Sequence, residues 1–213
     1  MDHAIYVFAT LFVTIGPIDV ASLFIAISFN ADAASRRQMA VRGTAVGAGV
    51  LLIFALAGEA LLDALGITMP AFRFAGGILL LLLAIDMVFA RHSGISGLTS
   101  IEGEEASSKQ DISIFPLAVP LIAGPGAIAS VILLMGEVQG ELTGQLTVLL
   151  VLVVVLLLTL AALLLAGRIV GLFGITGVNV ITRVLGIVLA ALAAQYILDG
   201  LARSGVLGTG GAP

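Results

Sequence analysis

An apolar run of 26 residues, from Ala4 to Phe29, is the feature that most constrains the fold of this chain. An α-helix rises about 1.5 Å per residue, so a run of this length can cross the hydrocarbon core of a bilayer. Its centre reads TIGPIDVAS (14–22), which places a glycine, a proline and an aspartate where no water satisfies the backbone. We therefore expect a membrane-spanning helix that is broken at Gly16-Pro17 and whose break faces the protein interior.

Composition places the whole chain in a membrane. Of its 213 residues, 60% are hydrophobic and only 10% are charged, whereas a soluble domain has about 25% charged residues. There is no cysteine, and the two histidines, His3 and His92, lie outside the apolar runs. We therefore expect contact with lipid and no metal site, cofactor or nucleic-acid partner.

Six apolar segments predict an all-α membrane protein with six transmembrane helices. The segments are 4–29, 40–62, 72–89, 114–135, 146–166 and 180–201. Their only substantial connection, 92–113, is rich in Gly and Glu, as a solvated linker is. We therefore divide the single transmembrane domain, 1–213, into a first three-helix repeat (1–91), a cytoplasmic acidic linker (92–113) and a second three-helix repeat (114–213).

The distribution of Lys and Arg predicts how these helices are oriented. Seven basic residues fall on one side of the six spans and two on the other. The richer side carries Arg36, Arg37, Arg42, Arg91, Lys109, Arg168 and Arg183, and the poorer side carries Arg73 and Arg203. Because basic loops stay in the cytoplasm, we expect the linker inside and both termini outside, in the inner (plasma) membrane of a bacterium.

The two halves of the chain resemble each other. The window TIGPIDVASL aligns with IAGPGAIASV at a shift of 108 residues, which matches Gly16-Pro17 with Gly124-Pro125. The window RFAGGILLLLLA from Arg73 aligns with RVLGIVLAALAA from Arg183 at a shift of 110. Because each half has an odd number of spans, the second half must cross with opposite polarity. The pattern predicts two inverted-topology repeats, with the first and fourth helices broken, as in many secondary transporters.

The paired breaks predict a substrate site at the centre of the membrane. Proline suits the first position of a helix, so each broken span would continue as a half-helix whose first N–H groups, of residues 18–20 and 126–128, face the gap. These N–H groups attract an anion and the preceding carbonyls attract a cation, so a zwitterion fits. The alternative is a pair of kinks that serve only packing. The candidate binding residues are Thr14, Gly16, Pro17, Ile18, Asp19, Ser22, Gly124, Pro125, Gly126, Ala127, Ser130 and Gln195.

Some of these polar residues have a second interpretation. The Thr and Ser hydroxyls could bond the backbone of their own helix instead of a substrate. Asp19 could cap the N–H groups of its half-helix, and Gln195 could bond a neighbouring helix. We expect Asn179 to be a helix cap.

Four charged residues, Asp19, Asp86, Arg73 and Arg183, are candidates for ion coupling or gating. Asp86 lies about one turn inside the predicted cytoplasmic end of the third span, where it could bind a coupling ion or be solvated at the interface. Arg73 and Arg183 begin equivalent helices, where they could anchor at the membrane surface or pair with a carboxylate as gate residues. A proton or a sodium ion is the coupling partner we consider.

Two further motifs carry a family resemblance. Together with the Gly16-Pro17 break, AGPGAI (123–128) and TRVLGIVLAALAAQYILDG (182–200) resemble the MarC family of bacterial and archaeal integral membrane proteins, over nearly the whole chain. The resemblance implies transport of small neutral amino acids such as alanine and glycine, as described for archaeal members. The chain departs from the family pattern at Gly16, where Asn or Asp is common, and at Asp19, where Gly is usual.

Taken together, the residues and the resemblance favour a secondary transporter of a small polar solute, of the alanine and glycine class, working by alternating access. A small-solute or ion channel is the alternative, because broken helices suit a channel too. A membrane-embedded enzyme is less favoured, because the chain lacks H-E-x-x-H and G-x-G-D motifs and a buried histidine. We expect no enzymatic activity, and the sequence leaves the oligomeric state open.

Overall fold

The computed structural model describes residues 2–90 and 111–205, which form helices joined by short turns, with no strand among them. The elements are α1 (Asp2–Ile15), α2 (Pro17–Ile27), α3 (Ala33–Ala64), α4 (Met69–Phe89), η1 (Ser113–Ile122), α6 (Pro125–Glu137), α7 (Leu142–Leu164) and α8 (Ala166–Arg203). The prediction of an all-α protein is therefore confirmed. The predicted linker, 92–113, lies outside the described residues except for its last three.

Five stretches of the described chain are long and apolar enough to cross a membrane. They are His3–Ile27, Ala33–Ala64, Met69–Phe89, Leu142–Leu164 and Thr176–Arg203. A sixth is present if η1 and α6, which meet at an angle of 54°, are counted as one span. With that pair included, the number agrees with the six predicted segments.

Two helices begin earlier than the hydropathy pattern predicts. The second span begins at Ala33 instead of residue 40, because Asp32 caps it by accepting a 3.0 Å hydrogen bond from the Ser35 N–H. The eighth helix begins at Ala166, and Gly174, at φ +65°, separates its first turns from the membrane-spanning part. Hydropathy detects only the apolar part of a helix, so a polar first turn escapes it.

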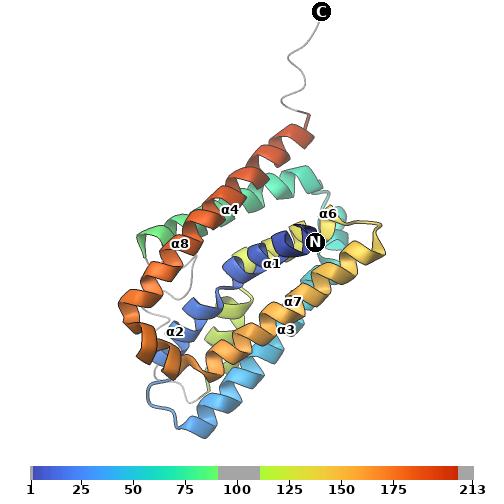
Figure 1. The fold of residues 1–213 in the computed structure, drawn as a ribbon. Coiled ribbons are helices and arrows are strands. Elements are labelled where there is room, and N and C mark those ends of the chain that lie inside the picture. The colour runs from blue at the N-terminus through green and yellow to red at the C-terminus, as the bar shows by residue number, and fades with distance from the viewer. Residues whose placement is uncertain (1, 91–110, 206–213) are drawn as a thin grey trace, which may run out of the picture.

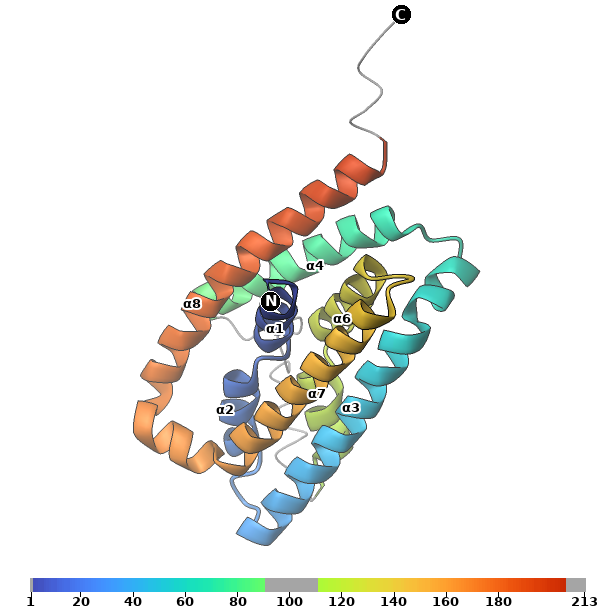
Figure 2. The same cartoon turned by 45° about the vertical axis from the view of Figure 1, so that its right-hand side comes forward.

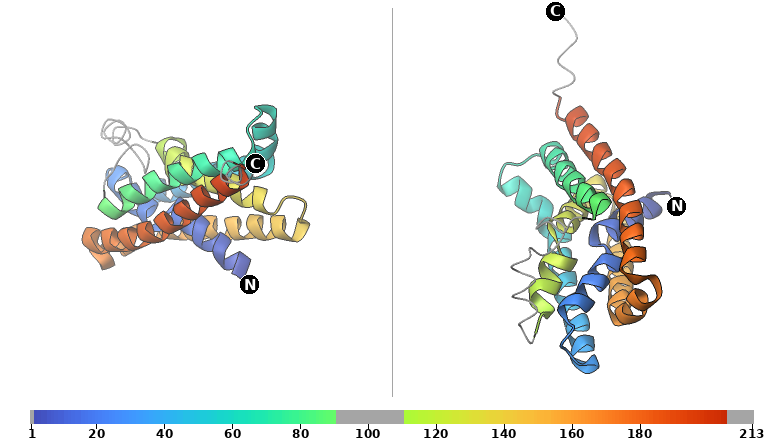
Figure 3. Two further views of the ribbon diagram at one scale, coloured as in Figure 1. Left: turned by 90° about the horizontal axis from the view of Figure 1, so that it is seen from above. Right: turned by 90° about the vertical axis from the view of Figure 1, so that its left-hand side faces the viewer.

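The helices form three layers (Figures 1 and 2). Helices α4 and α8 lie side by side in one outer layer, and Figure 3 shows the same pairing in two further views. Helices α3 and α7 form the other outer layer, and α1, α2, η1 and α6 lie between the two. The segments on either side of Gly16-Pro17 and Gly124-Pro125 therefore lie between the two outer pairs of helices.

Close packing between layers depends on glycine. A Cβ at Gly43 would lie 2.5 Å from a Leu117 side-chain carbon of η1, and a Cβ at Gly58 would lie 2.6 Å from Ile132 of α6. Between α4 and α8, a Cβ at Gly77 would lie 2.9 Å from the Ile197 backbone nitrogen. Such distances are too short for any real Cβ, so these helices approach each other only because the residues are glycine.

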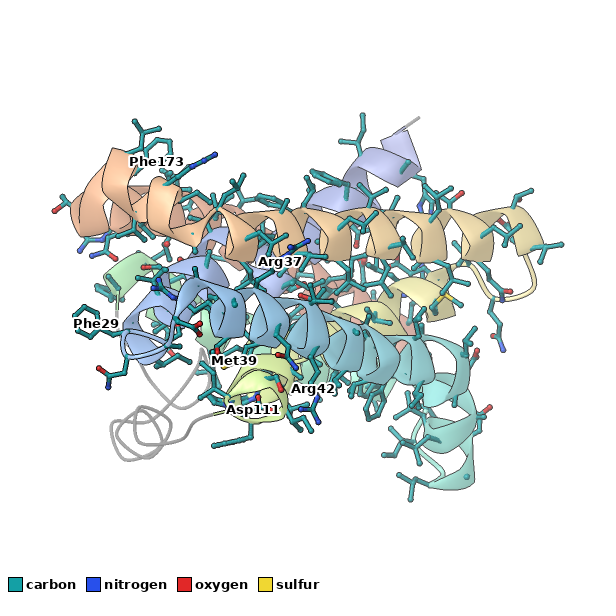
Figure 4. All side chains as sticks on the ribbon, turned by 90° about the horizontal axis from the view of Figure 1, so that it is seen from below. Phe29, Arg37, Met39, Arg42, Asp111 and Phe173 are labelled. Atoms are coloured by element: carbon teal, nitrogen blue, oxygen red, sulfur yellow. The ribbon has the colours of Figure 1, made fainter. Side chains whose placement is uncertain are left out.

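The bundle has two ends, which we name after two residues of α4. At the Arg73 end, Tyr6 near the start of α1 bonds Tyr196 of α8, and Arg73 near the start of α4 pairs with Glu137, the last residue of α6. At the Asp86 end, Arg42 of α3 forms a 2.7 Å ion pair with Asp111, just before η1 (Figure 4). Because this second pair is half-exposed, it contributes little to stability.

We predict that Gly77→Ala lowers the free energy of unfolding by about 1–3 kcal/mol, because the added methyl group meets backbone atoms of α8 that cannot move aside. The matched control is Gly49→Ala in α3, where no atom lies within 4 Å of the added Cβ. That change should be neutral or stabilising by up to about 1 kcal/mol, since alanine favours the helix. Thermal unfolding in detergent measures both; an equal effect of the two substitutions would contradict the packing argument.

Candidate functional site

A cavity lies where the middle layer meets α4 and α8. Eight of the predicted site residues line it: Thr14, Gly16, Asp19, Ser22, Asp86, Gly124, Pro125 and Gly126. The centres of water molecules can occupy about 100 Å³ of it, which is room for several waters or one small solute. Its lining reaches Ala90, the last described residue at the end of α4, so it extends toward the Asp86 end.

The first break places the start of α2 against the cavity. Gly16 adopts the left-handed conformation (φ +62°), which favours glycine, and Pro17 follows at the first turn of α2. In an unbroken helix the N–H of residue 17 would donate to the Val13 carbonyl. Pro17 has no N–H, so this hydrogen bond is missing. The Val20 N–H donates to the Gly16 carbonyl at 2.9 Å, so the prediction that this N–H faces the gap is wrong. The N–H group of Ile18, at the first turn of α2, has no acceptor within that helix.

The second break places the start of α6 against the same cavity. Gly124 precedes Pro125, and no side chain caps the helix. The Ile128 N–H donates to the Gly124 carbonyl at 3.0 Å, so the prediction for Ile128 is also wrong, and the N–H groups of Gly126 and Ala127 are left without an acceptor in the helix. A Cβ at Gly126 would lie 2.7 Å from a Leu83 side-chain carbon, so α6 begins in close contact with α4.

Two carboxylates give the cavity its charge. Asp19, in the first turn of α2, accepts a hydrogen bond from the Thr182 hydroxyl of α8. The N-cap position of α2 is Gly16, and Asp19 lies three residues further on, so its role as a cap stays a prediction. Asp86 of α4 is half-buried and lines the same cavity. Among the described lining residues, these two carry the charged side chains.

Helix α8 contributes residues that the sequence analysis missed. Asn179, expected to be a cap, lies inside α8 and lines the cavity together with Thr182. The Thr182 hydroxyl also lies 3.0 Å from the Val178 carbonyl. Residues 179 and 182 are three apart, so they share one face of an otherwise apolar helix. That spacing was the signal available in the sequence.

The remaining predicted binding residues do not line the cavity. Pro17, Ala127 and Ser130 are buried, Ile18 is half-buried, and Gln195 is exposed. Gln195 donates to Asp199, one turn along its own helix, at 2.9 Å. Ser130 is fully buried and its hydroxyl has no hydrogen-bond partner, whereas the hydroxyl of Thr14 donates to the Thr10 carbonyl at 2.8 Å.

The two arginines that begin equivalent helices differ in their surroundings. Arg73 is 2% exposed, and its guanidinium Nη2 lies 3.3 Å from Glu137 Oε1. The interpretation of Arg73 as a surface anchor is therefore wrong. Arg183 is exposed, and neither arginine lines the cavity.

The chain resembles a group of membrane proteins of archaea and bacteria. Residues 1–204 match the MarC family of integral membrane proteins. A UPF0056 membrane protein of Methanocaldococcus jannaschii is 32% identical over 201 residues, which cover 94% of this chain and 97% of the relative. The UPF0056 membrane protein YhcE of Escherichia coli is 30% identical over 194 residues, covering 91% and 89%. The UPF0056 membrane protein YvbG of Bacillus subtilis is 32% identical over 200 residues, which cover 92% of this chain and 93% of the relative. No solved structure matches the chain at a significant level.

We predict that Ser22→Cys and Asn179→Cys react with a hydrophilic maleimide at least about a hundredfold faster than Ser130→Cys, because a thiol reacts only where the reagent can reach it. The native chain has no cysteine, so each variant carries a single thiol. Labelling rates of the folded protein measure the difference. Equally slow reaction of all three thiols would show that water does not fill the cavity.

Proposed function

Because the chain belongs to the MarC family of integral membrane proteins, we propose that this multi-pass membrane protein is a secondary transporter of a small zwitterion. The substrate class is a neutral amino acid such as alanine or glycine, and the mechanism is alternating access. The observation that supports this most is the cavity itself, in which an uncapped helix start and two carboxylates face one small space. The names of the relatives state no substrate; the zwitterion is inferred from the chemistry of the cavity, and the alanine and glycine class from the family resemblance.

The two breaks would bind opposite ends of the zwitterion. Both helix starts carry partial positive charge, but α2 already has a carboxylate, Asp19, in its first turn. Helix α6 has no acidic residue in its first turn and no side-chain cap, so the substrate carboxylate binds the N–H group of Gly126, which lines the cavity. The substrate ammonium then lies toward Asp19 and Asp86, whose charges it offsets.

The apolar part of the lining supports a small aliphatic side chain. Val13, Leu83, Met87 and Val178 face the same space as the polar groups. A larger solute would have to displace these side chains, and a second charge would have to be buried among them without a partner. Alanine and glycine are small enough, and neither has a charged side chain.

The packing of the layers supports an inverted repeat. Helix α2 of the first half contacts α7 and α8 of the second, and α6 of the second half contacts α3 and α4 of the first. Exchanging the two halves therefore preserves the pattern of contacts, as alternating access between two equivalent arrangements requires. In the orientation that the basic residues predict, the Asp86 end is cytoplasmic, so this conformation faces inward.

Asp19 is the candidate for coupling to a proton or a sodium ion. The Thr182 hydroxyl has one hydrogen and two acceptors within reach, the Asp19 carboxylate and the Val178 carbonyl. Protonation of Asp19, or a cation bound to it, would release that hydrogen to Val178. The state of Asp19 would thus change the link between α2 and α8, two helices from different halves.

A channel is the alternative function. Buried apolar side chains, including Leu80, Leu133 and Leu189, pack between the cavity and the Arg73 end. In the conformation described, the space that faces the Asp86 end is thus separated from the other end, which favours a transporter over a pore.

We predict saturable exchange of small zwitterions by the purified protein in liposomes. Liposomes loaded with unlabelled alanine or glycine should take up the labelled amino acid at least about tenfold faster than empty ones, since a carrier reorients more readily with solute bound. Repeating the assay with pH and sodium gradients, in the parent and in Asp19→Asn, tests coupling through this carboxylate. Absence of exchange by folded protein contradicts the proposal, and uptake without counterflow supports the channel.

The proline breaks generate a separate prediction. Pro17→Ala and Pro125→Ala should reduce exchange at least about tenfold, equivalent to about 1.4 kcal/mol of binding, because a restored N–H closes the gap in the helix. Neither change should lower the unfolding temperature by more than a few degrees.

The matched control is Pro70→Ala. Pro70 also lies in the first turn of its helix, α4, but that helix is capped by the Thr68 hydroxyl and Pro70 does not line the cavity. Exchange by this variant should equal that of the parent. Parental exchange by all three variants would refute a role for the breaks.

A further inference from the structure

Four polar residues from four helices meet at the Arg73 end, away from the cavity. Tyr6 lies ten residues before Gly16 on the way into the cavity, and Arg73 lies 13 residues before Asp86. Glu137 follows Pro125 by 12 residues, and Tyr196 follows Thr182 by 14. At about 1.5 Å per residue, each lies roughly 15–21 Å along its helix from the cavity. We call Tyr6, Arg73, Glu137 and Tyr196 the polar cluster.

Two contacts hold the polar cluster together. The Tyr6 hydroxyl donates to the Tyr196 hydroxyl at 2.7 Å, which links α1 to α8. The Arg73 guanidinium lies 3.3 Å from the Glu137 carboxylate, which links α4 to α6. All four helices contribute to the lining of the cavity, so the two contacts join its walls on the side toward the Arg73 end.

An apolar layer separates the polar cluster from the cavity. Tyr196 packs in a buried group with Val13, Leu80, Leu133 and Leu189, and Tyr6 packs against that group. Val13 also lines the cavity. The route from the cavity to the Arg73 end therefore leads first through tightly packed apolar side chains and then through the two polar contacts.

Burying the Arg73–Glu137 ion pair of the polar cluster has a desolvation cost. Arg73 is 2% exposed and its Nε has no hydrogen-bond partner, whereas the Glu137 side chain remains 20% exposed. A buried ion pair often adds no stability over apolar residues of the same size. Water entering past Glu137 would hydrate both charges and lower the cost of separating them. The pair therefore suits a contact that must form in a dry state and open in a wet one.

We propose that the polar cluster and the apolar layer beneath it form the gate that closes the cavity at the Arg73 end. This inference rests on the proposed transport function. Opening requires the Tyr6–Tyr196 and Arg73–Glu137 contacts to break together, as the walls formed by α1, α4, α6 and α8 separate. Arg183, which occupies the equivalent position in the repeat alignment, is exposed, whereas Arg73 is buried.

A single thiol in the apolar layer tests this gate. Val13→Cys, in the otherwise cysteine-free chain, is exposed to a membrane-impermeant maleimide from one membrane face at a time, in intact cells and in inverted vesicles. Leu142→Cys, 70% exposed beside the end of α6, identifies the face at the Arg73 end. We expect Val13→Cys in the parent to react slowly from that face, and Glu137→Gln to raise the rate at least about tenfold, because it leaves buried Arg73 without its partner only in the closed state.

Two further variants make the result specific. Tyr6→Phe removes only the hydroxyl that bonds Tyr196. It should also raise the labelling rate of Val13→Cys from the Arg73 face, and thermal unfolding checks that the variant folds. Asp111→Asn makes the same carboxylate-to-amide change in the half-exposed Arg42–Asp111 pair, and it should leave labelling unchanged. If Glu137→Gln does not fold, Tyr6→Phe alone decides the outcome.

Equal labelling of Val13→Cys from the Arg73 face in the parent and in every folded gate variant would overturn the gate. A rise with Asp111→Asn as large as that with the gate variants would also overturn it, because the effect would then be a general loosening. The exchange assay separates this inference from the proposed function. If the gate variants raise the labelling rate but no zwitterion is exchanged, the proposed solute is refuted and the gate is not. If zwitterions are exchanged but the gate variants do not change the labelling rate, the gate alone is refuted.

Discussion

The need to satisfy every backbone polar group inside a bilayer determines where this protein can form a site. Gly16-Pro17 and Gly124-Pro125 each lie where one helix ends and the next begins, within stretches apolar enough to cross a membrane. A break in a membrane-spanning helix persists only away from lipid. The outer helices, α3 with α7 and α4 with α8, pack on either side of the helices that contain the breaks. The glycines that let the layers approach closely thus serve the cavity as well as packing.

The two breaks differ in backbone conformation and in charge. Each is followed by a helix that begins with proline, but Gly16 is left-handed (φ +62°) whereas Gly124 is extended (φ -78°, ψ 169°). Only the first has a carboxylate in its first turn, because Asp19 stands opposite Ala127 in the repeat alignment. Asp86 adds a second negative charge from α4. The two aligned segments therefore differ in the charged side chains that they bring to the cavity.

Much of the fold follows from the pattern of residues. The all-α class and the set of apolar segments agree with the structure, because hydropathy over about 20 residues reports directly on burial in lipid. Helix starts were less accurate at Ala33 and Ala166, where the first turns are polar or lie beyond the span. Seven of the twelve predicted binding residues line the cavity, whereas Gln195 is exposed and bonds its own helix, and four residues beside the breaks do not line it: Pro17, Ile18, Ala127 and Ser130.

The sequence by itself determined that the chain spans a membrane and that its first apolar run contains Gly-Pro and an aspartate, because composition and local order of residues are enough for both. Tertiary structure alone decided which side chains share the cavity, bringing Thr182 of α8 against Asp19 of α2. It also decided that Arg73 is buried against Glu137 while Arg183 is exposed. The physical reason is that similar sequence windows do not encode their neighbours: the environment of a charge depends on which helices pack around it.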